Sequence, residues 1–155
     1  GVSETSFAPE RTMTRAMLVT VLYRAEGSPA ATATANFADV ESGQWYTEAI
    51  AWAVQNGIAT GYDSRTFGAN DAITREQMAQ MLYRYASYKE FDVRAEADFT
   101  SFSDAGTISP WAKDGMTWAV GSGLIQGISS AKLAPNAQST RAQVATVLMR
   151  LLGEK

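Results

Sequence analysis

The sequence predicts an all-α fold of repeated helix–loop–helix units, whose equivalent helices pack about a common axis. Two observations predict it. Three stretches share one gapless spacing pattern, in which a Gly is followed fourteen positions later by the Arg of a Thr-Arg pair, and they begin at Gly1, Gly61 and Gly127. After each Thr-Arg pair, apolar residues recur at the spacing of a helix with one buried face.

The composition excludes most enzyme chemistry. The chain has 155 residues, of which 46% are hydrophobic and 19% are charged, so one compact domain with a sizeable core is expected. It contains no His and no Cys, which removes the usual general base, thiolate nucleophiles and zinc–thiolate sites. The net charge of -3 predicts no nucleic-acid binding, and no apolar run approaches a membrane span. We therefore expect no catalytic site, metal or cofactor.

A second repeated block, the front block, precedes two of the three copies, at residues 37–60 and 102–126. Its two Trp residues lie seven apart in each case, and a Gly follows twelve positions after the first Trp. Apolar residues at helical spacing predict a helix that ends at Gly57 in one copy and at Gly123 in the other. Gly115 lies within the second of these helices and suggests a tight contact there.

The first copy starts at Gly1 with its rear half. By comparison with residues 37–60, we expect 24 residues of a front block to precede Gly1 in the parent protein, and any export signal to lie outside the chain. Without that block, Leu18, Val19 and Leu22 are expected to be partly uncovered. The stretch from Gly61 to Ile73 is rich in Gly, Asn, Asp and Ser and predicts a loop with room for a short β-bridge.

The rear helix of each copy begins at a Thr. Thr74 with Gln77, and Thr140 with Gln143, fit a capping box, whereas Thr14 keeps the cap but loses the reciprocal bond. The methionines are predicted to fill the core: Met13, Met17, Met78, Met81, Met116 and Met149.

Three arginines are the first candidates for a binding role: Arg15, Arg75 and Arg141. Each falls in the first turn of its rear helix, where the helix dipole disfavours a cation by a few tenths of a kcal/mol. A structural interpretation is an ion pair with Asp39, Asp104 or Asp63. A functional interpretation is a bound anion, because the guanidinium and exposed first-turn N–H groups would point donors at one place. The residues alone favour neither.

Trp45 and Trp111 present a similar choice. Aromatic residues at a helix start are more often core or crevice lining than ligand platforms. Beside an Arg, however, the apolar ring face would suit a sugar acid. Asp39 and Asp104 fit caps of the front helix or partners of an Arg, and direct contact with sugar hydroxyls is the less favoured role.

These motifs resemble S-layer homology modules. The resemblance rests on Phe-x-Asp-Val, Trp-Tyr-x-x-Ala-Ile, Gly-Ile-x-x-Gly-Tyr, Phe and Ile-Thr-Arg-Glu-Gln within residues 37–77. It covers nearly the whole chain, as a rear half module (1–27), a linker (28–36), a second module (37–89), a linker (90–101) and a third module (102–155), in one compact domain. The resemblance implies a pseudo-threefold bundle with grooves between adjacent modules.

The resemblance also implies a function and a set of site residues. It implies a non-catalytic, extracellular anchor that attaches surface proteins to secondary cell-wall polysaccharide of a Gram-positive-type envelope, often through pyruvylated amino sugars. The family's Arg, which reaches the acidic group of the ligand, falls on Arg15, Arg75 and Arg141. Its Trp falls on Trp45 and Trp111, its acid on Asp39 and Asp104, and its loop Gly on Gly1, Gly61 and Gly127.

The sequence departs from the family in two respects. The frequent Thr-Arg-Ala-Glu ends in Met17, Gln77 and Gln143, and the first copy has no front block. A rival hypothesis is therefore a protein–protein or self-assembly module that associates through the incomplete first copy, with the arginines in structural ion pairs.

Overall fold

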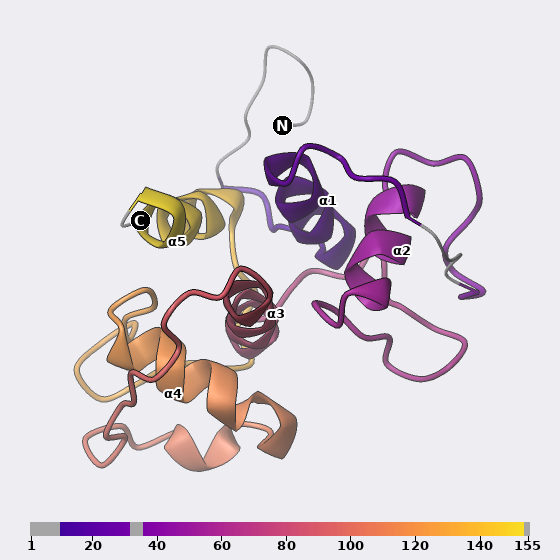
Figure 1. Cartoon of the computed structure of the whole chain (residues 1–155). Coiled ribbons are helices and arrows are strands. Elements are labelled where there is room, and N and C mark those ends of the chain that lie inside the picture. The colour runs from indigo at the N-terminus through magenta and orange to yellow at the C-terminus, as the bar shows by residue number, and fades with distance from the viewer. Residues whose placement is uncertain (1–9, 32–35, 154–155) are drawn as a thin grey trace. The chain divides into compact units, whose positions relative to one another are not determined.

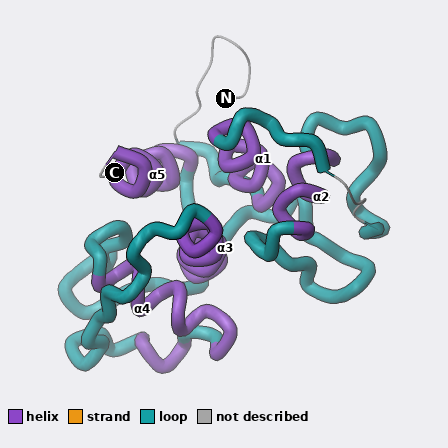
Figure 2. Tube along the Cα trace, in the orientation of Figure 1, coloured by secondary structure: helices purple, strands orange, loops and turns teal. Residues whose placement is uncertain are grey.

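The chain is helical in the computed structural model, which describes residues 10–31 and 36–153. The described residues form five α-helices, which Figure 1 labels: α1 (Arg15–Ala25), α2 (Thr47–Gln55), α3 (Arg75–Tyr88), α4 (Lys113–Gly121) and α5 (Arg141–Gly153). They also form two 3-10 helices, η1 (Ala105–Thr107) and η2 (Pro110–Ala112). Loops join them, and no strand occurs within the described ranges (Figure 2). The predicted all-α class is confirmed.

The chain divides into two compact units. Unit 1 comprises Gly1–Met13, Ile73–Tyr83 and Asp92–Lys155, and unit 2 comprises Thr14–Ala72 and Arg84–Phe91. Each unit combines the rear helix of one copy with the front block and loop of the next copy. In unit 2, α1 packs on α2; in unit 1, the first part of α3 packs on α4.

Unit 2 is built around aromatic contacts between α1, α2 and the end of α3. The ring of Trp52 lies 5.6 Å from that of Tyr23 and 5.9 Å from that of Tyr88, between ring centroids. The Glu26 carboxylate accepts hydrogen bonds from the Tyr85 hydroxyl (2.7 Å) and from the Lys89 ammonium (3.1 Å). These contacts pack the last turn of α3 against the end of α1 and bury Tyr85 there.

The expected exposure of the first copy is wrong. Leu18, Val19 and Leu22 are all fully buried. The reason is the pairing of copies, since α1 is covered by α2, which belongs to the following copy. The cover of α1 therefore does not depend on a front block of its own copy.

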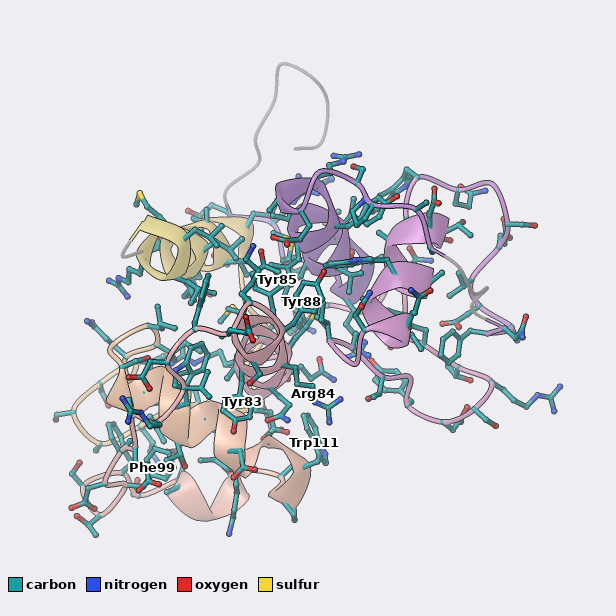
Figure 3. The ribbon with its side chains drawn as sticks, viewed as in Figure 1. Tyr83, Arg84, Tyr85, Tyr88, Phe99 and Trp111 are labelled. Atoms are coloured by element: carbon teal, nitrogen blue, oxygen red, sulfur yellow. The ribbon has the colours of Figure 1, made fainter. Side chains whose placement is uncertain are left out.

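In unit 1, α4 approaches α3 very closely. A Cβ atom at Gly115 would lie 2.5 Å from the Gln80 Cα, and the Gly115 N–H donates to the Gln80 Oε1 (3.0 Å). The Tyr83 and Trp118 rings are 5.8 Å apart, and Figure 3 shows Tyr83 on the side of α3 that faces α4. The tight contact predicted at Gly115 is confirmed.

The predicted caps are also confirmed. The Thr74 Oγ1 accepts from the Gln77 N–H (3.2 Å), and the Gln77 Oε1 accepts from the Thr74 N–H (3.0 Å). Thr140 and Gln143 form the same pair of bonds, whereas Thr14 only accepts, from the Met17 N–H. The predicted helix ends at Gly57 and Gly123 are confirmed as well, because both have a positive φ, of 71° and 80°.

A ring of three backbone hydrogen bonds joins the residues that precede the three capping threonines. The Met13 N–H donates to the Ser139 carbonyl (2.9 Å), the Ser139 N–H to the Ile73 carbonyl (2.9 Å), and the Ile73 N–H to the Met13 carbonyl (2.7 Å). All three residues belong to unit 1. Short bridges of the kind expected from the sequence occur in both units: Thr12 with Thr140 and Thr74 with Gln138 in unit 1, and Thr14 with Ala72 in unit 2.

Five of the six methionines lie in or next to the core, as predicted, but Met149 does not. Met149 lies on α5 and 69% of its surface is exposed. No helix in the described part of unit 1 covers this side of α5.

Candidate functional site

The Arg15 side chain reaches the loop of the next copy. Its Nε donates to the Phe67 carbonyl oxygen (3.1 Å), and its Nη2 donates to the Thr60 carbonyl oxygen (2.7 Å). The rings of Tyr62 and Phe67 lie over the guanidinium, with their centroids 4.9 and 4.8 Å from its central carbon. Only 6% of Arg15 is exposed. The cation is thus held in a hydrogen-bonded and aromatic environment.

Arg75 repeats this geometry in unit 1. Its Nε donates to the Leu133 carbonyl oxygen (2.8 Å) and its Nη2 to the Gln126 carbonyl oxygen, and 8% of the residue is exposed. Leu133 and Gln126 stand at the repeat positions of Phe67 and Thr60. The second site therefore has the same backbone contacts but an aliphatic residue in place of the Phe.

The expectation of exposed first-turn N–H groups beside these arginines is wrong. The Arg15 N–H donates to the Asp71 carbonyl and the Ala16 N–H to the Ala69 carbonyl, both at 3.0 Å. In unit 1 the N–H groups of Arg75 and Glu76 likewise donate to carbonyl groups in the loop of the third copy, those of Ala137 and Pro135. The backbone of these helix starts is therefore occupied, and only the side chain is left to meet an anion.

The structural alternative, an ion pair with a nearby aspartate, is wrong for Arg15 and Arg75. Within residues 10–31 and 36–153, neither Arg15 nor Arg75 has a carboxylate oxygen within 4 Å. The nearby aspartates contribute to the field of each cation without forming a direct pair.

Asp39 holds the backbone of the loop that contacts Arg15. Its Oδ1 accepts from the Phe67 N–H (2.8 Å), and its Oδ2 accepts from the Gly68 N–H (2.7 Å) and the Ala69 N–H (3.3 Å). Partial burial raises the pKa of this carboxyl, but the backbone hydrogen bonds together outweigh it, and the pKa falls below its ordinary value.

Asp104 does the same in the third copy. It accepts from the N–H groups of Leu133 and Ala134, both at 2.9 Å. The bond from Leu133 is the largest cause of a pKa below the ordinary aspartate value. Both aspartates therefore orient a loop 28 to 30 residues further along the chain, a role that the sequence did not predict.

Burial lowers the pKa of both guanidinium groups, but Arg stays charged at any ordinary pH. Around Arg15 the negative potential comes from the carboxylates of Asp71 and Asp39, whereas around Arg75 it comes from that of Asp104. Asp71 is replaced by Ala137 in the third copy, so the Arg75 site carries less compensating charge.

Gly61 is required by a close approach. A Cβ atom there would lie 2.5 Å from the Phe37 Cε1 and 2.7 and 2.8 Å from two backbone oxygens. Gly127 lies in the same way against Phe102 and two backbone oxygens. These glycines let the loop fold beneath the Phe of the Phe-x-Asp motif. Gly1 lies outside the described residues.

Trp45 and Trp111 are not core residues. They are 53% and 52% exposed, whereas the second Trp of each front block, Trp52 or Trp118, is buried. Trp45 touches Tyr46 edge-on, and the Trp111 side chain extends away from the ribbon at η2 (Figure 3). About half of each side chain is therefore open to solvent.

Arg141, the third arginine, is buried like the others. Its backbone N–H donates to the Arg11 carbonyl (2.8 Å).

Sequence reasoning missed Tyr62, whose ring covers Arg15 and whose hydroxyl donates to Asp71 (2.9 Å). Its position directly after Gly61 was the only available signal. In the described ranges no three acidic side chains are grouped as metal ligands.

Comparison with known proteins identifies the family. Residues 36–79 and 101–145, more than half of the chain, match the S-layer homology domain. The chain belongs to the S-layer homology family. Similar proteins include "Exoglucanase XynX" of Acetivibrio thermocellus and "Surface-layer 125 kDa protein" of Lysinibacillus sphaericus, each 35% identical over 98% of the chain. "Amylopullulanase" of Thermoanaerobacterium thermosulfurigenes is also 35% identical. The chain spans 14%, 13% and 8% of these proteins, respectively.

The enzyme names of these relatives describe other parts of much longer proteins. This S-layer homology chain is a non-catalytic module, and the family places it at the extracellular cell surface, as the sequence predicted. Among the described helices, none has both the length and the apolar character needed to cross a bilayer.

Proposed function

We propose that the chain anchors its parent protein to the cell wall by binding acidic, pyruvylated secondary cell-wall polysaccharide of a Gram-positive-type envelope. The ligand carboxylate would bind Arg15, Arg75 and Arg141 in grooves between adjacent modules. The modules would have the boundaries given in the sequence analysis. Family membership supports the anchoring role, as do relatives such as "Surface-layer 125 kDa protein" and "Cell surface glycoprotein 1".

The observation that carries the proposal is that Arg15 and Arg75 are nearly buried without a carboxylate partner in the described structure. Each is a nearly buried cation whose described hydrogen bonds go to neutral carbonyl groups, and neither has a carboxylate within 4 Å. Burying a charge is costly unless it is paired, and a carboxylate is the planar acceptor that a guanidinium binds best. An acidic ligand at the remaining Nη1 edge would supply the missing counter-charge.

The other predicted residues support this binding in two ways. Trp45 and Trp111 would offer exposed ring faces to the C–H groups of a sugar. The other four predicted residues would have an indirect role. They hold the loop whose backbone carbonyl groups position each arginine, and they are Asp39, Asp104, Gly61 and Gly127. A polymer that engages more than one site gains avidity without new contacts.

The test compares polysaccharide with and without its acidic groups, because this change leaves the protein intact. Purified secondary cell-wall polymer and the same polymer after mild-acid removal of pyruvate are titrated against the chain. We expect binding to fall at least about tenfold when pyruvate is removed. Equal binding of the two polymers would refute the carboxylate as the recognised group.

Protein variants then locate the site. Arg75→Lys keeps the positive charge but loses the planar guanidinium. We therefore expect a weaker affinity for the acidic polymer, with a smaller change in the free energy of unfolding than in the free energy of binding. Arg94→Ala is the matched control, because Arg94 is exposed in the connection between copies and pairs only with Asp92 in the described structure. Full binding by Arg15→Lys and Arg75→Lys together would place recognition elsewhere on the chain.

A further inference from the structure

One loop position carries a different charge in each copy of the repeat. It lies ten residues after the loop Gly and holds a basic, an acidic and a neutral residue in the first, second and third copies. Its backbone carbonyl accepts the N–H of the arginine at the start of a rear helix in every case. The pairs are Asp71 with Arg15 (3.0 Å), Ala137 with Arg75 (2.9 Å) and Arg11 with Arg141 (2.8 Å). The same backbone contact therefore brings a residue of different charge next to each arginine.

The Asp71 carboxylate is held near the Arg15 guanidinium but does not pair with it in the described structure. Its Oδ2 accepts from the Tyr62 hydroxyl (2.9 Å), and the centroid of the Tyr62 ring lies 4.9 Å from the central carbon of the guanidinium. The same ring packs on Gly68, where a Cβ atom would lie 2.5 Å from the Tyr62 Cε2. Tyr62 is thus fixed between the loop and the cation, and it keeps the carboxylate close enough to repel an anion that binds Arg15.

The Arg75 site lacks this arrangement. Ala137 has no charge and no acceptor in its side chain. Ile128 stands at the repeat position of Tyr62, carries no hydroxyl and is 62% exposed. Neither the carboxylate nor the group that holds it in place is therefore present beside Arg75.

The wider charge distribution favours the Arg75 site as well. Two carboxylates act on Arg15, those of Asp39 and Asp71. The carboxylate that acts on the other guanidinium is that of Asp104, and it is itself close enough to Lys132 to feel the ammonium charge. An anion therefore meets more negative charge at the Arg15 site than at the Arg75 site.

We propose that the Asp71 carboxylate makes the Arg15 site the weaker of the two for the acidic ligand and leaves the Arg75 site as the principal one, a step that rests on the function proposed above. An anion at Arg15 is attracted by the guanidinium and repelled by Asp71, and the latter repulsion has no counterpart at Arg75. Because Asp71 is exposed, water and salt screen much of this repulsion. We therefore expect an affinity about three- to fivefold lower at Arg15 in low salt.

The two sites can be titrated separately by NMR. Each arginine Nε–H is held in a hydrogen bond to a loop carbonyl, that of Phe67 for Arg15 and that of Leu133 for Arg75. Their side-chain N–H signals are assigned with Arg15→Lys and Arg75→Lys, and a pyruvylated amino sugar is the probe. We expect the Arg75 signal to reach half-saturation at about three- to fivefold lower probe concentration at about 20 mM salt, and the difference to shrink at about 300 mM.

Asp71→Asn separates the charge from the hydrogen bond, since the amide oxygen can still accept from the Tyr62 hydroxyl. It should bring half-saturation at Arg15 to within about twofold of that at Arg75. Tyr62→Phe is its counterpart, because it removes the hydroxyl and keeps the carboxylate, and it should leave Arg15 the weaker site.

The reciprocal variant is Ala137→Asp, at an exposed loop position, and it should weaken probe binding at Arg75. Glu90→Gln is the matched control. It removes an exposed carboxylate of unit 2 that is not among the groups acting on Arg15, and both titrations should stay as in the parent.

Equal half-saturation of the two signals in the parent, or a tighter Arg15 site, would overturn this inference and leave the proposed function standing. So would an Asp71→Asn chain with the thermal midpoint of the parent and an unchanged Arg15 titration, or an unchanged Arg75 titration in Ala137→Asp. A probe that shifts neither arginine signal would overturn the proposed function as well.

Discussion

Replacing Asp39 with Ala should release the loop that surrounds Arg15. The carboxylate accepts three backbone N–H groups from consecutive residues, Phe67 to Ala69, and no other side chain in the described structure bonds them. Without it, these donors must find water or remain unpaired.

The expected cost follows from the number and setting of these bonds. A hydrogen bond to a charged group contributes about 1.5–3 kcal/mol when shielded, but Asp39 is only half-buried and one bond is long, at 3.3 Å. We therefore expect a loss of about 2 kcal/mol in the free energy of unfolding. For a chain of this length, that loss lowers the thermal midpoint by about 4–8 °C.

The assay is thermal and urea unfolding followed by circular dichroism. Asp39→Asn, which keeps one acceptor oxygen, should lie between Asp39→Ala and the parent. Asp98→Ala is the control, because Asp98 is exposed and its described hydrogen bonds come from Thr100, two residues along the chain. A midpoint for Asp39→Ala within about 1 °C of the parent would refute the reasoning that this carboxylate holds the loop.

Three further outcomes are expected. Gly61→Ala should cost about 2 kcal/mol or more, since its Cβ has no room, whereas Gly106→Ala, in open space, should stay within about 0.5 kcal/mol in urea unfolding. Thr140→Ala should cost about 1 kcal/mol through the lost cap, measured in the same way; an unchanged midpoint would contradict the cap. Because the folded-state pKa values of Asp39 and Asp104 lie below the ordinary 3.8, their stabilisation is complete above that pH and is lost as the pH falls further. Acid titration of Asp39→Asn should accordingly show a shallower loss of stability than the parent below that pH, and an equal slope would contradict this assignment.

The sequence by itself determined the local structure. Repeat spacing located every rear helix, the Thr and Gln residues predicted the capping boxes, and Gly57 and Gly123 predicted where the front helices end. These features depend on residues within about one helical turn of each other, whose conformational preferences are short-range. The resemblance of the motifs likewise identified the family.

The tertiary structure decided which distant groups the repeated Arg and Asp side chains meet. Arg15 and Arg75 bond carbonyl groups 45 to 58 residues away, and Asp39 and Asp104 bond loop N–H groups rather than these arginines. It also decided which rear helix is uncovered, because each front block packs on the rear helix of the copy before it. Spacing along the chain specifies which residues share a helix face, but only the folded chain brings a covering element to that face, and for α5 the described chain brings none.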